Sequence, residues 1–158
     1  FLRRTAIGGV TAKTAGPLSS SVRWVRMVRA GSQLTAYVSS DGNAWTSIGA
    51  SALALGTTAY VGLAVTSSEV GIRTTANLSN VSVAQAALRR GQLSGDVGLP
   101  AIKGSALFDA ARYTVRAGGA GIKGTAHQFH FVYQAVSGGA DVIAGLEGRG
   151  GGGRTAAA

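Results

Sequence analysis

Apolar and polar residues alternate along much of the chain with the two-residue period of β-strands. In residues 57–67, Ala59, Val61, Leu63 and Val65 fall on one side of the alternation and polar or small residues on the other. Successive side chains of a strand point to opposite faces, so this pattern predicts a half-buried strand. The expected strands are residues 22–29, 34–40, 44–48, 57–67, 74–83, 113–116 and 127–136. Their close spacing predicts an all-β fold, an antiparallel β-sandwich.

A hairpin is predicted where the strand at residues 34–40 ends. Asp41-Gly42 follows directly, and glycine adopts a positive φ without steric penalty. The returning strand then carries Trp45. The sequence therefore predicts that these two strands are antiparallel neighbours.

Residues 127–136 place three rings on one face of a strand, Phe129, Phe131 and Tyr133, which we call the aromatic stripe. His130 and Gln134 fall on the opposite face. Large aromatic side chains are highly buried on average, so we expect the aromatic stripe in the core. The predicted sandwich requires this stripe to meet the apolar face of residues 59–65 across a shared interior.

Composition and charge narrow the function classes. The 158 residues include 25 Gly and no Cys, and the net charge is +9. Without Cys there is no disulfide framework and no thiolate metal site. The arginines are scattered rather than clustered in one run, so we expect no specific nucleic-acid binding. No apolar run is long enough to span a membrane.

No catalytic or metal-binding constellation stands out. His127 and His130 are three residues apart, so in a strand they point to opposite faces and cannot chelate one ion together. No acidic pair has spacing suited to acid–base work, and no nucleophile elbow is present. We therefore expect a protein that is not an enzyme and that uses no cofactor.

Several segments carry a resemblance to a known family. They are FLRRTAIGG (1–9), WVRMVRAGSQLTAYVSSDGNAWTSIG (24–49), YVGLAVTS (60–67), NLSNVSV (77–83) and YTVRAGGAGIKGTAHQFHFVYQAVSGG (113–139). They resemble the concanavalin A-like jelly-roll modules of bacterial secreted proteins, labelled regulation-of-enolase-like. The first four resemble the later half of a module and the fifth resembles its opening. The chain departs from the family at Lys123, where Trp is usual, and at His127, where Asp is usual.

The resemblance implies an inverted order of parts. Residues 1–83 correspond to the later half of a module, 84–98 to a linker and 99–147 to the opening strands. Glycine-rich residues 148–158 are expected to be a disordered tail that replaces the strands usual after Gly139. The halves either close on each other as a circular permutant, or leave an incomplete fold that exchanges strands with a second copy.

The family and the exposed aromatic and polar residues together suggest the function. Sugar-binding sandwiches use flat rings surrounded by amide, hydroxyl and acid groups. The candidate ligand-binding residues are Tyr37, Trp45, Tyr60, His130 and Gln134. We expect a noncatalytic carbohydrate- or surface-binding module, extracellular within a longer secreted protein, with a polysaccharide or cell-surface glycan as partner. The alternatives are a purely structural sandwich repeat, a nonfunctional gene fragment and, less favoured, a glycan-cleaving enzyme.

Overall fold

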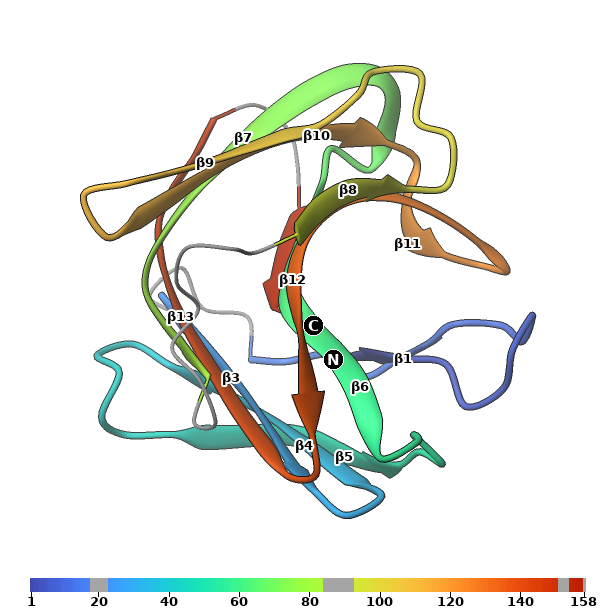
Figure 1. The fold of residues 1–158 in the computed structure, drawn as a ribbon, viewed down its shortest axis with the longest axis vertical. Coiled ribbons are helices and arrows are strands. Elements are labelled where there is room, and N and C mark those ends of the chain that lie inside the picture. Colours follow the sequence, from blue (N-terminus) through green and yellow to red (C-terminus); the bar gives the residue numbers. More distant parts are fainter. Residues whose placement is uncertain (18–22, 84–92, 151–153, 158) are drawn as a thin grey trace.

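Antiparallel strands make up the fold in two layers. The computed structural model describes residues 1–17, 23–83, 93–150 and 154–157. A seven-stranded sheet curves around a five-stranded sheet (Figure 1). The expected all-β, antiparallel sandwich class is confirmed. None of the described segments forms a helix of the length and apolarity needed to cross a bilayer.

The larger sheet has the strand order β5-β4-β3-β13-β7-β10-β9. Its strands, in that order, are Thr46–Ala52, Gln33–Ser39, Trp24–Ala30, Ala140–Gly150, Glu69–Val83, Arg112–Gly119 and Ser105–Asp109. Strands β4 and β5 form the hairpin that Asp41-Gly42 predicts, with Ala36 opposite Gly49.

The smaller sheet has the order β11-β12-β6-β14, and β8 also pairs with β12. These strands are Gly121–Lys123 (β11), Ala126–Ser137 (β12), Thr58–Thr66 (β6), Arg154–Ala157 (β14) and Leu93–Val97 (β8). A separate two-stranded ribbon joins β1 (Leu2–Arg3) to β2 (Ala12–Lys13).

The core lies between the two sheets. Leu63, Val65 and Val132 of the smaller sheet pack in one cluster with Leu78 and Val115 of the larger sheet. Because each sheet covers the apolar face of the other, their inward side chains are removed from water together.

The two halves of the sequence share both sheets. Strand β13 lies between β3 and β7, β10 pairs with β7, and β12 pairs with β6. Strands from residues 1–83 therefore pair with strands from residues 99–147 in both sheets.

Two irregular regions expected from composition contain strands. Residues 93–97 of the expected linker 84–98 form β8, while residues 84–92 lie outside the described residues. After Gly139 the chain continues as β13, which reaches Gly150, and β14 occupies 154–157 of the expected tail. Glycine-rich segments can form such strands because backbone pairing, such as Gly148 opposite Asn77, needs no side chain to bury.

The expected position of the aromatic stripe is wrong. Strands β6 and β12 are neighbours in one sheet, with Val132 opposite Leu63 and His130 opposite Val65. Opposite residues share a face, so Val132 (2% exposed) and His130 point into the core, and the aromatic stripe lies on the other face. Alternation separates the two faces of a strand, but the neighbouring strand decides which of them is inward.

Candidate functional site

Two of the five candidate residues meet on the outward face of the larger sheet. The Arg26 guanidinium lies over the rings of both Tyr37 and Trp45, with 5.6 Å from Cζ to each ring centroid. Ala36 and Val38 of the same strand are buried, so Tyr37 between them faces outward. We call Arg26, Tyr37, Trp45 and Asp141 the Arg26 cluster.

Asp141 fixes the arginine of this cluster. Arg26 Nε donates to both carboxylate oxygens of Asp141, at 2.9 and 3.1 Å, and Nη2 donates to Oδ2 at 2.6 Å. These hydrogen bonds raise the pKa of Arg26 above its ordinary value. Because the guanidinium is held at both Nε and Nη2, the two rings stack on a charge of fixed orientation.

The β3–β4–β5 hairpin strands bring the cluster together. Arg26 on β3 pairs directly with Tyr37 on β4. Asp141 lies on β13, which pairs with the other edge of β3, and its side chain contacts Arg26 on the same face. The cluster therefore combines strands from both halves of the sequence, and its two charged members were not among the expected ligand-binding residues.

Tyr60 and Gln134 lie apart from the Arg26 cluster. Tyr60 is 65% exposed and meets Tyr133 edge to face, with ring centroids 5.4 Å apart. It therefore extends the aromatic stripe on the outer face of the smaller sheet. Gln134 pairs with Val61 on the opposite, inward-pointing face and is half-buried.

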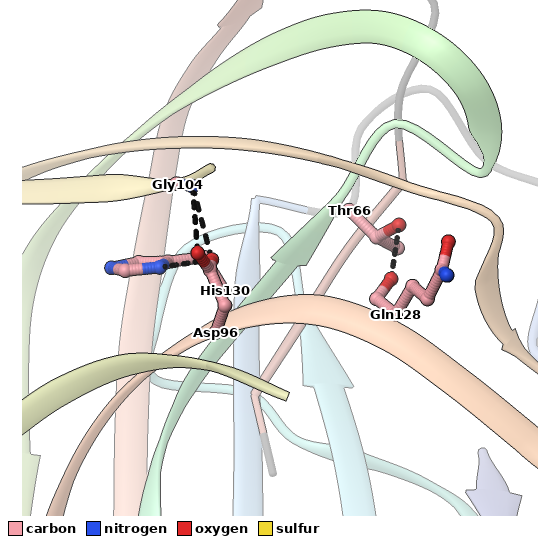
Figure 2. Close-up of polar contacts among 5 residues, drawn as sticks. All are labelled: Thr66, Asp96, Gly104, Gln128 and His130. Atoms are coloured by element: carbon pink, nitrogen blue, oxygen red, sulfur yellow. Dashed lines mark hydrogen bonds and ion pairs between the residues drawn. The ribbon is translucent and has the colours of Figure 1, made fainter. Parts of the chain in front are cut away.

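His130 was expected at a ligand surface, and the structure places it in the interior instead. Its side chain is buried, and Nδ1 lies 2.8 Å from Oδ1 of Asp96 on β8 (Figure 2). The backbone N–H of Gly104 donates to both oxygens of the same carboxylate, at 3.0 and 3.2 Å. His130 points inward because it lies opposite Val65 on β6, and opposite residues of paired strands share a face.

The Asp96–His130 pair resembles the half of a catalytic triad that orients a base, but within the described part of the chain no nucleophile is hydrogen-bonded to this histidine. His130 Nε2 is buried and has no hydrogen-bond partner. A base acts only when the proton it removes lies within hydrogen-bond reach. The pair therefore connects β8 to β12, and the Gly104 amide also connects the segment before β9 to this pair.

Little in the sequence indicated this pair, since Asp96 lies in the segment expected to be a linker. The weak signal was Leu93 and Val97, two apolar residues of even spacing around it.

Near the start of β12, a second polar contact joins this strand to β6. Thr66 Oγ1 donates to the backbone oxygen of Gln128 at 3.0 Å (Figure 2).

The two histidines occupy opposite faces of β12, as their spacing predicts. His127 lies on the side of the aromatic stripe, with its ring centroid 6.4 Å from that of Phe129. Its pKa is lowered, mainly because burial disfavours the charged form and further because Arg4 is near. Across the described part of the chain, no three His, Asp or Glu side chains gather as metal ligands do.

Comparison with known proteins finds no match for this chain among protein families, curated proteins or solved structures. The resemblance to concanavalin A-like modules therefore rests on the sequence segments themselves.

Proposed function

We propose that this chain is a noncatalytic module that binds a polysaccharide or cell-surface glycan through the Arg26 cluster. The observation that carries the proposal is the pair of rings, Tyr37 and Trp45, held against one arginine on an outward sheet face. Sugars present apolar C–H faces to aromatic rings and hydroxyls to neighbouring charged groups. The cluster supplies both kinds of contact.

The chemistry of the cluster favours binding over cleavage. Asp141 is engaged in the bidentate pair with Arg26, which holds its carboxylate as a hydrogen-bond acceptor. Both side chains keep partial exposure, 30% for Arg26 and 24% for Asp141, so a ligand hydroxyl can reach them. Glycoside hydrolysis needs a second carboxylate beside the first, and the Arg26 cluster contains one acid only.

The proposed setting is outside the cell, in a longer secreted protein. Supporting this is the resemblance to secreted jelly-roll modules, while the absence of Cys leaves the redox compartment open.

The experiment is retention on immobilised polysaccharides of different backbone chemistry. Trp45→Ala and Tyr37→Ala should each weaken retention by about fivefold or more, since one aromatic stack contributes on the order of 1 kcal/mol or more. Tyr60→Ala is the matched control, an exposed aromatic on the other sheet, and should bind like the unmodified protein. Circular dichroism verifies that each variant is folded.

Two results would contradict the proposal. Equal loss in Tyr60→Ala would move the binding surface to the aromatic stripe. Failure of the folded protein to bind any glycan tested would remove the glycan-binding function itself.

A further inference from the structure

The turn between β1 and β2 is apolar and extends into solvent. Residues 6–10 of this turn, which we call the apolar tip, carry no polar side chain. Ile7 is fully exposed and Val10 is 74% exposed, and a Cβ at Gly8 would meet no atom within 4 Å. Exposed turns usually contain Asn, Asp, Ser, Gly or Pro. Two exposed aliphatic side chains in one turn leave apolar area in water that a partner surface could cover.

The neighbouring β11–β12 turn holds the apolar tip in place. The Thr11 amide donates to the backbone oxygen of Gly124 at 3.1 Å, and Arg4 Nη2 donates to the same oxygen at 2.9 Å. Within the tip, the Gly9 amide donates to the backbone oxygen of Ala6 at 3.0 Å. The two turns therefore project together from one side of the molecule (Figure 1).

Basic side chains flank the apolar tip on both turns. Lys13 of β2 and Lys123 of β11 are exposed, and Arg4 precedes the tip. Residues 1–17 and 110–140 contain no acidic residue. Among the described residues, no ion pair involves any of these three cations. Their positive charge is therefore not neutralised by a paired acid.

We propose that the apolar tip docks on an anionic phospholipid surface, with Ile7 and Val10 at the acyl boundary and the flanking lysines against the headgroups. Aliphatic side chains beside cations suit this surface, because the lipid charge attracts the lysines while the aliphatic groups leave water. Nucleic acids also attract lysines, but the proteins that bind single strands stack bases on aromatic rings, and the tip has no ring. This inference is independent of the glycan proposal, because the Arg26 cluster takes no part in it.

The experiment is cosedimentation of the full chain with vesicles of phosphatidylcholine alone, or of phosphatidylcholine and phosphatidylglycerol in equal parts. We expect binding to the anionic vesicles to be at least about tenfold stronger. It should weaken when sodium chloride is raised from about 0.1 M to about 1 M, which shortens the Debye length from about 10 Å to about 3 Å. Trp45→Ala should bind the vesicles like the unmodified protein, which keeps this site distinguishable from the glycan site.

Variants separate the apolar and the basic contributions. Ile7→Ser combined with Val10→Ser should lower the partition constant by about tenfold or more. Lys13→Gln and Lys123→Gln should each lower it by about fivefold, since one lysine near the surface contributes about that factor.

Each contribution has a matched control on the larger sheet. Leu107→Ser removes an aliphatic side chain that is 64% exposed on β9, and Arg116→Gln removes one exposed charge on β10. Each control should change the partition constant by less than about twofold, because charge effects fall off within a Debye length. Circular dichroism verifies that each variant is folded.

A fluorescent label tests insertion directly. The chain has no Cys, so Val10→Cys provides a single attachment point for an environment-sensitive fluorophore, and Leu107→Cys provides the control. The emission from position 10 should shift to the blue on anionic vesicles, and that from position 107 should stay unchanged.

Three results would overturn the proposal. They are failure of the full chain to bind either vesicle, equal binding to both vesicles, and loss of binding in the lysine variants without loss in the combined serine variant. The last result would indicate a general anion-binding surface, such as one for nucleic acid, instead of a lipid-docking tip.

Discussion

His130 and Asp96 lie directly opposite each other on β12 and β8, with 2.8 Å between Nδ1 and Oδ1. A carboxylate only accepts hydrogen bonds, so the imidazole donates from Nδ1. The contact spans 34 residues of sequence and joins a buried side chain to the strand that pairs with residues 129–133 of β12. The pair therefore stabilises the attachment of β8 to the smaller sheet.

Replacement of Asp96 by Ala should lower the free energy of unfolding by about 1–3 kcal/mol. The substitution removes the acceptor of a buried imidazole N–H, and an unsatisfied buried donor carries a cost of that size. The Gly104 amide loses its acceptor as well, so its hydrogen exchange should become faster. Urea denaturation and amide exchange measure the two effects.

The control for this substitution is Glu147→Ala. Glu147 forms an ion pair with Arg112 at 2.6 Å, but both side chains are more than a third exposed. An exposed ion pair contributes less than about 1 kcal/mol. Equal losses of stability in the two variants would show that Asp96 makes no more than a surface contact.

Gly104 lies against the His130 ring and leaves no room for a side chain. A Cβ at this position would stand 2.4 Å from the ring atoms Cγ and Nδ1. Gly104→Ala should therefore push the connection before β9 away from β12 and destabilise the fold by about 1–3 kcal/mol. Calorimetric or urea unfolding gives the comparison.

Gly95→Ala is the matched control, because it lies on β8 beside Asp96 and no atom stands within 4 Å of its Cβ position. Alanine there should leave stability unchanged or raise it slightly, since it restricts the unfolded chain. A loss in Gly95→Ala as large as that in Gly104→Ala would mean that glycine is needed for another reason than the His130 contact.

Local signals in the sequence were sufficient for the strands that alternate clearly and for one turn. Residues 57–67 alternate over their whole length and form β6, and Asp41-Gly42 forms the turn between β4 and β5. Strand β8 carries one glycine and β13 carries three, and both strands form because neighbouring backbones pair with them. No local pattern reports such pairing.

The residues of the candidate site were likewise predictable only where a local signal marked them. Tyr37 and Trp45 were expected as exposed aromatics, and the hairpin places both rings against Arg26. The sequence could not supply Asp141, which is 115 residues from Arg26 along the chain. For His130 the period of two was right, but its inward direction depends on the register with β6.

The stability of the protein should fall as the pH drops through the titration of His127. Its folded-state pKa lies below the ordinary value of 6.5, first because of burial and then because of Arg4. The unfolded chain therefore binds this proton more readily, so stability contributed above pH 6.5 is lost progressively below it. Proton NMR of the His127 ring gives the pKa, and urea unfolding from about pH 8 to about pH 5 gives the stability.

His127→Gln should flatten this part of the pH profile, while the remaining histidine is common to both proteins. Arg4→Gln should move the His127 pKa upward, since it removes the second cause of the shift. A profile identical in the unmodified protein and in His127→Gln would assign the pH dependence to other groups.

Two glycines with left-handed backbones separate the cost of conformation from the cost of packing. Gly42, in the β4–β5 turn, has a φ of 80°, and a Cβ there would stand 2.9 Å from Trp24 Cε2. Gly31, in the β3–β4 turn, has a φ of 61° and no atom within 4 Å of its Cβ position. Gly31→Ala should lower the free energy of unfolding by about 1 kcal/mol for the backbone alone. Gly42→Ala should lower it by a further 1–3 kcal/mol or so, because the methyl group displaces the indole. Urea unfolding of both variants measures the difference, and equal values would show that Trp24 yields to the added methyl without cost.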